Sequence, residues 1–114
     1  MTKIYHNPRC SKSRETLKLL QEKGIDPEII LYLETPPDAK TLQGLLKKLG
    51  LKARELMRTK EADYKTQGLD NPELGEDDLI AAMIATPKLI ERPIVVNGNK
   101  AALGRPPEQV LDIL

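Results

Sequence analysis

The residues best suited to chemistry lie in the short basic run NPRCSKSR, which contains the only cysteine of the chain, Cys10. A cysteine reacts as its thiolate, and positive charge or the N–H groups of a helix N-terminus stabilise that form. Cys10 lies where a loop leads into a predicted helix, close to Arg9 and Lys12. The pattern therefore predicts a reactive thiolate, whereas most free cysteines are small buried apolar side chains.

The same helix N-terminus is suited to bind an anion, because its free N–H groups point away from the helix. Ser11 and Ser13 carry hydroxyls that are candidates to cap the helix or to contact the anion. His6, at the end of the preceding strand, is a candidate to hold the thiolate by its charge or by a hydrogen bond. Taken alone, His6 is equally well explained as a half-exposed polar residue.

Three arginines at the ends of predicted elements extend the candidate anion site. Arg92 and Arg105 each precede a proline, and Arg58 ends a short apolar patch. A planar guanidinium matches two oxygens of a tetrahedral oxyanion better than an ammonium group does. The spacing leaves open whether the three arginines converge on Cys10 or are ordinary solvated side chains.

The composition excludes several other classes of function. One cysteine and one histidine provide neither an internal disulfide nor a Cys/His zinc site, so a redox partner must be another molecule. The 18 basic and 17 acidic residues give a net charge of +1, which argues against non-specific nucleic-acid binding. The chain has no apolar run of the length of a signal peptide or membrane span, so we expect a cytoplasmic protein.

The elements that must position these residues follow from periodicity, glycine and proline. The length of 114 residues predicts one domain, residues 1–114. We expect a strand at 2–6, a helix at 11–23 ended by Gly24, and a buried strand at 28–33 parallel to the first. The later elements are a helix from 38 to Gly50, two short helices around Arg58, a helix from Glu76, a hairpin of strands 93–97 and 100–103, and a terminal helix from Pro106.

This order is typical of an α/β protein with a thioredoxin-like fold. Such a fold has a four-stranded mixed sheet flanked by helices, and a helical insertion at about residues 35–90 would separate its βαβ and ββα halves. In thioredoxin-like folds a cis proline before the third strand faces the active cysteine. Pro93 occupies that position, although a trans proline is the more common way to begin a strand.

The chain resembles the glutaredoxin-dependent arsenate reductase family. The matching segments, in the same order, are IYHNPRCSKSRETL, IILYLETPP, RELMR, LIERPIVV and GRPPEQVLDIL. The resemblance implies that Cys10 is the catalytic nucleophile and that His6 helps to lower its pKa. It also implies that Arg58, Arg92 and Arg105 bind the oxyanion and its reduced adduct.

The resemblance also implies a reaction in which the Cys10 thiolate attacks arsenate and forms a thiol–arsenate ester. Glutathione would supply the second sulfur, and glutaredoxin would resolve the mixed disulfide. The enzyme would act as a monomer and would need no bound cofactor or metal. One alternative is a glutaredoxin-like thiol oxidoreductase that keeps an anion pocket. Another is an Spx-type regulator that binds RNA polymerase, but such proteins typically carry a CxxC switch, and this chain has Ser13 at the second position.

Overall fold

The computed structural model describes all 114 residues and divides into two compact units. The first unit consists of Met1–Thr35 and Arg92–Leu114, and the second of Pro36–Glu91. The sequence predicts a helical insertion at about 35–90 within one domain. The second unit has nearly the bounds of this predicted insertion. That residues 1–114 form one domain stays a prediction.

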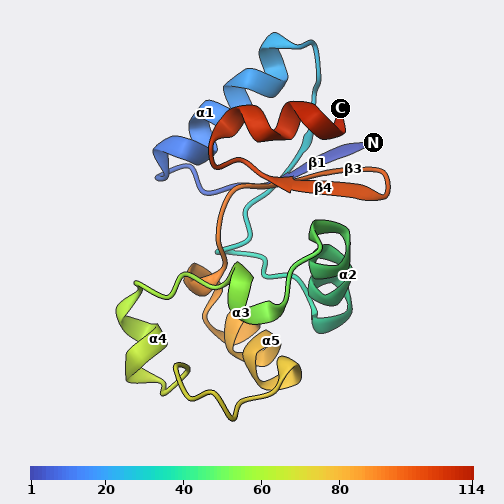
Figure 1. Ribbon diagram of the computed structural model, residues 1–114. Helices are drawn as coiled ribbons and strands as arrows, with labels where there is room; N and C mark the ends of the chain where they lie inside the picture. The colour runs from blue at the N-terminus through green and yellow to red at the C-terminus, as the bar shows by residue number, and fades with distance from the viewer. The chain divides into compact units, whose positions relative to one another are not determined.

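A four-stranded mixed sheet forms the centre of the first unit (Figure 1). Its strands are β1 (Thr2–Tyr5), β2 (Glu28–Ile30), β3 (Ile94–Asn97) and β4 (Lys100–Leu103), in the spatial order β2-β1-β3-β4. β1 is parallel to β2 and antiparallel to β3, and β3 is antiparallel to β4. The predicted α/β class and thioredoxin-like fold are therefore confirmed.

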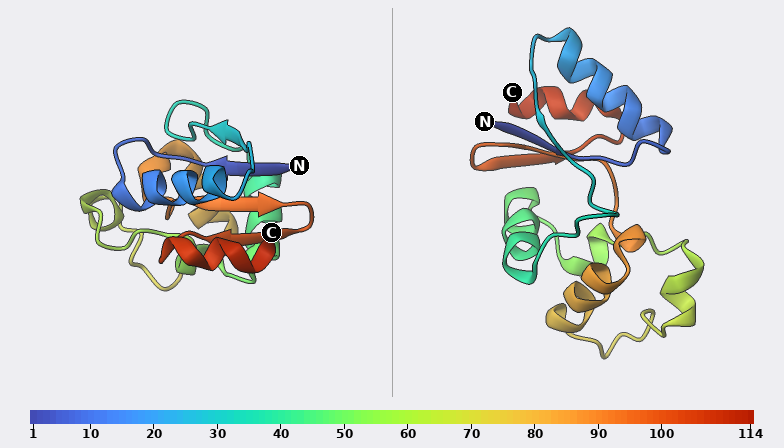
Figure 2. Two further views of the ribbon diagram at one scale, coloured as in Figure 1. Left: turned by 90° about the horizontal axis from the view of Figure 1, so that it is seen from above. Right: turned by 180° about the vertical axis from the view of Figure 1, so that it is seen from behind.

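Two helices cover the same face of this sheet, as both views in Figure 2 show. They are α1 (Ser11–Glu22) and the 3-10 helix η2 (Pro107–Ile113), which pack on each other. Burial of apolar side chains between helices and sheet supplies the main stabilisation of this unit. Its buried hydrophobic cluster consists of Ile4, Leu20, Val95 and Val110.

The buried side of α1 carries two hydroxyl groups. The helix ends at Gly24, which has a φ of +78°, as the sequence predicts. Leu17 and Leu19 are only partly buried, however, whereas Ser13 and Thr16 are fully buried. A hydroxyl can be buried at little cost when it has hydrogen-bond partners, and both of these do.

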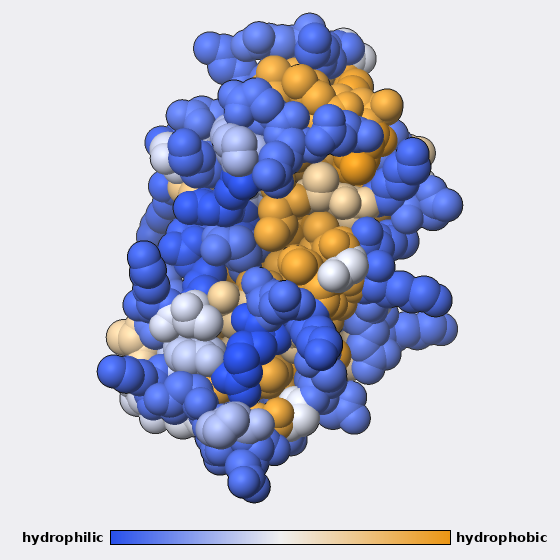
Figure 3. All heavy atoms as spheres, viewed as in Figure 1, coloured by the Kyte–Doolittle hydropathy of each residue, from blue (hydrophilic) through white to orange (hydrophobic).

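Two further elements correct the sequence-based expectations. The buried strand predicted at 28–33 is wrong, because β2 ends at Ile30 and lies at the edge of the sheet. An edge strand is covered less well, and Ile29 and Leu33 are accordingly 46% and 42% exposed. The terminal helix is a 3-10 helix rather than an α-helix, and hydrophobic atoms reach the surface near it (Figure 3), where Leu111 and Leu114 are exposed.

The second unit is helical. It contains α2 (Ala39–Leu49), α3 (Ala53–Leu56), α4 (Ala62–Thr66), α5 (Glu76–Ala85) and the 3-10 helix η1 (Pro87–Leu89). α2 begins at Asp38, whose carboxylate accepts a hydrogen bond of 2.7 Å from the Thr41 N–H, and ends at Gly50 with a φ of +70°. Both ends are as predicted. No helix in the protein is long and apolar enough to cross a membrane.

The core of the second unit is apolar. α5 packs on α2 and α3 through side chains such as Leu42, Leu56 and Met83, each of which is 0% exposed. Arg54 fixes the segment that follows α4, because its guanidinium donates hydrogen bonds to the Tyr64 hydroxyl and to the carbonyl oxygens of Leu69 and Asn71. Apolar burial and the hydrogen bonds of Arg54 therefore both help to arrange the short helices.

Candidate active site

A tight turn between β1 and α1 carries the cysteine. β1 ends at Tyr5, and Pro8, three residues later, cannot donate a backbone hydrogen bond and so does not continue the strand. The Cys10 N–H donates to the Asn7 carbonyl (3.0 Å), and the Arg9 N–H donates to the Asn7 side-chain oxygen (3.0 Å). The guanidinium of Arg14, one helical turn after Cys10, donates a hydrogen bond of 2.9 Å to the Pro8 carbonyl oxygen. These bonds place Cys10 at the N-cap of α1, with extended backbone angles.

The surroundings of Cys10 favour its charged form. Burial raises the pKa of the thiol, but interactions with the backbone N–H of Ser13, with the Arg92 guanidinium and with the N–H of Lys12 lower the pKa by more. The net result is a pKa below the ordinary value of a cysteine. The N–H groups that act on the sulfur belong to the first turn of α1, whose positive end favours a negative charge. The helix terminus and one arginine thus favour the thiolate.

A buried hydrogen-bond network fixes the loop that carries Cys10. His6 Nδ1 lies 2.6 Å from the Ser13 hydroxyl oxygen, which also accepts a hydrogen bond of 3.0 Å from the Asn7 N–H. Burial, and then the charge of Arg14, lower the pKa of His6. The lowered pKa favours the neutral form of His6, and the contact that His6 makes is the hydrogen bond with Ser13. Its role toward the thiolate stays a prediction.

The two serines differ in position. The Ser13 side chain is 0% exposed and its hydroxyl is used by the loop, so only its backbone N–H faces the sulfur. Ser11 is exposed and makes no capping hydrogen bond. Contact of either serine with an anion stays a prediction.

Two of the three arginines belong to the same unit as Cys10. Arg92 interacts directly with the thiol, and Arg105 donates a hydrogen bond of 3.3 Å to the Arg92 carbonyl. The Arg92–Pro93 peptide bond is cis, the alternative that the fold suggested. The Arg105–Pro106 bond is also cis, which the sequence did not indicate. Arg92 and Arg105 are thus brought together, and Arg92 reaches the sulfur.

Arg58 belongs to the second unit, between α3 and α4. An isolated antiparallel bridge between Met57 and Ile90 fixes its backbone, and the Arg58 N–H donates to the Leu89 carbonyl at 2.7 Å. Its guanidinium donates to the Glu91 carboxylate at 2.7 Å, and its Nε lies 3.7 Å from a carboxylate oxygen of Glu61. The sequence did not predict that Glu91 pairs with Arg58, although Glu91 directly precedes Arg92 in the chain.

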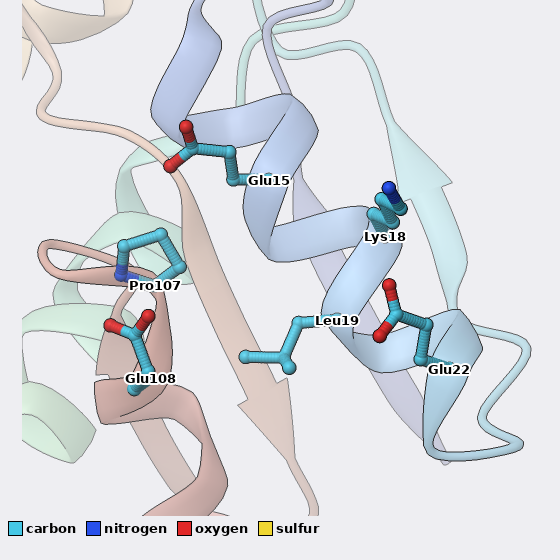
Figure 4. Close-up of a pocket in the computed structure, with 6 residues that line it drawn as sticks. All are labelled: Glu15, Lys18, Leu19, Glu22, Pro107 and Glu108. Atoms are coloured by element: carbon cyan, nitrogen blue, oxygen red, sulfur yellow. The ribbon is translucent and has the colours of Figure 1, made fainter.

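Two hollows lie in the first unit. One, of about 290 Å³, borders the cysteine loop and is lined by His6, Asn7, Pro8, Arg9, Leu31, Leu33 and Glu34. The other is a groove between α1 and η2, lined by Glu15, Lys18, Leu19, Glu22, Pro107 and Glu108 (Figure 4). Its three carboxylates would repel an oxyanion. The helix end at Cys10 is therefore the better anion site.

Comparison with known proteins places this site in a family context. Residues 5–113 match the model of the ArsC family. A Haemophilus influenzae protein named arsenate reductase is 55% identical over 112 residues, which make up 97% of each chain. The Escherichia coli protein YfgD, described as uncharacterized, is 65% identical over 98% of this chain and 95% of its own. The structure of an arsenate reductase from Vibrio cholerae has a TM-score of 0.97 at 56% identity, and the match covers 99% of this chain and 97% of that one.

Proposed function

The chain belongs to the ArsC family, and we propose that it reduces arsenate to arsenite through the thiolate of Cys10. The observation that carries the proposal is the environment of this sulfur, which combines a helix N-terminus, the Arg92 guanidinium and a lowered pKa. A thiolate at such a site can act as a nucleophile while the same groups attract an oxyanion. The name of the Haemophilus influenzae relative supports arsenate as that oxyanion.

In the first step, the Cys10 sulfur attacks arsenic, and one arsenate oxygen leaves as water after taking up protons. The product is a thiol–arsenate ester in which arsenic is still pentavalent. Negative charge on the arsenate oxygens is then stabilised by donors that are already in place, which is usually a large contribution to enzymatic rate enhancement. Arg92 and Arg105 supply these donors from the first unit, and Arg58 is proposed as the third on the basis of family resemblance.

The reduction itself transfers two electrons to arsenic, and two thiols supply them when they form one disulfide. Cys10 is the only thiol of the chain, so the second thiol must come from outside. We propose glutathione for this role. Arsenite leaves as the disulfide between Cys10 and glutathione forms, and glutaredoxin then restores the Cys10 thiol by thiol–disulfide exchange.

The test is a coupled assay that contains the purified protein, arsenate, glutathione, glutaredoxin, glutathione reductase and NADPH. We expect arsenate-dependent loss of NADPH, and we expect Cys10→Ser to reduce it to the level without protein. Equal rates for the wild type and Cys10→Ser would contradict the proposal. Replacing glutaredoxin by thioredoxin and its reductase tests the choice of reductant separately, because only the electron donor changes.

A matched assay on a small disulfide substrate separates this proposal from a general thiol oxidoreductase. Arg105 touches the Arg92 carbonyl and is exposed, so Arg105→Ala leaves the contact between Arg92 and the sulfur in place. We expect Arg105→Ala to lower arsenate turnover while disulfide exchange at Cys10 continues. Equal loss of both activities would favour the thiol oxidoreductase.

A further inference from the structure

Gly104 is buried directly after β4, and two side chains from distant parts of the sequence occupy the space that a Cβ there would need. A Cβ at this position would overlap the Thr16 hydroxyl oxygen, lie 3.0 Å from Thr16 Cγ2 and lie 2.7 Å from Pro93 Cγ. Thr16 and Pro93 are themselves fully buried, so neither has free space to move into. A side chain at position 104 would therefore have to displace one of them.

Both neighbours of Gly104 lead directly to the anion site. The Thr16 hydroxyl donates a hydrogen bond of 2.8 Å to the Lys12 carbonyl, in the first turn of α1. The N–H groups of that turn, from Lys12 and Ser13, stabilise the Cys10 thiolate. Displacement of Thr16 would therefore move the helix end relative to the sulfur.

The second neighbour leads to the arginines. Pro93 follows Arg92, whose guanidinium interacts with the Cys10 sulfur. The Gly104 N–H donates a hydrogen bond of 3.0 Å to the Pro93 carbonyl, and Arg105 follows Gly104 in the chain. Gly104 thus lies where the segments of both arginines meet α1.

We infer that Gly104 is a positioning residue of the anion site, because its missing side chain lets α1, the Arg92–Pro93 segment and Arg105 come together in direct contact. Gly104 does not touch the reacting atoms and acts through Thr16 and Pro93. The inference deepens the proposed function and rests on it for the identity of the anion. The geometry at the sulfur can be tested without that identity.

The decisive variant is Gly104→Ala. The φ of Gly104 is not in the left-handed region, so alanine adds no backbone strain and its effect is that of the added methyl group alone. A shift of about 1 Å in catalytic groups can cost roughly a hundredfold in rate. We expect the pKa of the Cys10 thiol to rise by about 1 unit or more, as loss of a nearby positive group produces, and kcat/KM for arsenate to fall at least about tenfold.

The thiol pKa is measured from the pH dependence of alkylation by iodoacetamide, which requires no arsenate. Gly44→Ala is the matched control, because Gly44 lies within α2 and a Cβ there would meet nothing within 4 Å. We expect this control to keep the wild-type pKa and activity. If Gly104→Ala is folded and keeps both, the inference is overturned, even if its melting temperature is lower.

A double variant covers the case in which Gly104→Ala does not fold. Thr16→Ala removes both threonine atoms that a Cβ at position 104 would meet, and the space gained lets the segment move away from Pro93. We expect Gly104→Ala/Thr16→Ala to be closer to the wild type than Gly104→Ala, in yield of folded protein and in thiol pKa. A double variant that is no closer overturns the inference.

These measurements separate the inference from the proposed function. If the wild type does not reduce arsenate but Gly104→Ala raises the thiol pKa, the proposed substrate is wrong and the positioning role stands. If the wild type reduces arsenate and Gly104→Ala changes neither pKa nor kcat/KM, the function stands and the positioning role is wrong.

Discussion

The two units of the protein bury different kinds of side chain. All four buried polar residues, His6, Asn7, Ser13 and Thr16, belong to the first unit and flank Cys10 in the sequence. The buried core of the second unit consists of hydrophobic side chains. Buried polar groups add little to stability, but they have few alternative arrangements once their hydrogen bonds are formed. The first unit therefore uses part of its interior to fix the cysteine loop, whereas the second unit uses its interior to fold.

The arginines show the same contrast. In the second unit, Arg54 binds three oxygen acceptors of its own unit, and Arg58 lies between the carboxylates of Glu61 and Glu91. In the first unit, Arg92 interacts with the sulfur of Cys10. The comparison indicates that changes in the apolar core of the second unit act mainly on stability, and that changes near Cys10 act mainly on reactivity.

The largest effect on stability is expected in the second unit. Leu42→Ala removes a side chain that is 0% exposed, and such a cavity costs about 2–5 kcal/mol in the free energy of unfolding. Denaturant unfolding measures this loss, with the exposed Lys40→Ala, expected to change it by less than about 0.5 kcal/mol, as the control. The pKa of Cys10, measured by alkylation, should stay at the wild-type value. A shifted pKa in folded Leu42→Ala would contradict the division of roles.

Arg92→Ala should have the largest effect on reactivity. It removes a side chain that lowers the pKa of Cys10, and loss of such a positive neighbour raises a pKa by about 1–3 units. The alkylation rate of the wild type should rise with pH and level off above a pKa that is lowered from the usual value of a cysteine. In Arg92→Ala the same curve should move to higher pH. Curves that coincide would show that Arg92 does not stabilise the thiolate.

Ser13→Ala should give a smaller loss of stability in the first unit. It removes the hydroxyl that bonds His6 and the Asn7 N–H, and leaving buried partners unsatisfied costs about 1–3 kcal/mol. Denaturant unfolding gives the loss, and Ser11→Ala, at an exposed position, is the control. An equal loss in the two variants would argue against the buried network.

The His6 network also predicts a dependence of stability on pH. Because burial and Arg14 lower the pKa of His6 in the folded protein, the unfolded chain binds more protons around pH 6. Stability contributed by neutral His6 is therefore present above the unfolded pKa of ~6.5 and lost as the pH falls below it. Unfolding measured between about pH 7 and pH 5 should show a smaller decrease for His6→Gln than for the wild type. Equal decreases in stability for the two proteins would show that a group other than His6 causes the pH dependence.

The smallest effect is expected at Glu91. Glu91→Gln keeps an oxygen that accepts the Arg58 hydrogen bond but removes one negative charge beside the guanidinium. Partly exposed ion pairs of this kind contribute about 0.2–1 kcal/mol, so KM for arsenate should fall by no more than about fivefold, at nearly constant kcat. Steady-state kinetics at low salt measure this change in KM. A rise in KM would show that Glu91 mainly positions Arg58.

Features that depend on neighbouring residues in the sequence could be predicted. The ends of α1 and α2 at Gly24 and Gly50, and the start of α2 at Asp38, follow from local backbone preferences and capping. The place of Cys10 at a helix N-terminus is of the same kind. These signals need no knowledge of the tertiary fold.

Features that depend on contacts between distant segments could not be predicted. The exposure of Ile29 follows from the edge position of β2 in the sheet, and that order is a tertiary property. Burial of Ser13 and Thr16 depends on partners that periodicity treats as polar surface. Gly104 looks like an ordinary strand-ending glycine until Thr16 and Pro93 are seen against it.

The solitary, partly exposed Cys10 also has a consequence for stoichiometry. A chain with one thiol can form a disulfide with only one other sulfur at a time. Air oxidation can therefore yield disulfide-linked dimers but nothing larger than a dimer. Every adduct of glutathione, of a labelling reagent or of a second protein chain therefore adds one fixed mass at one known residue. The mass of the intact protein counts the occupied active sites directly.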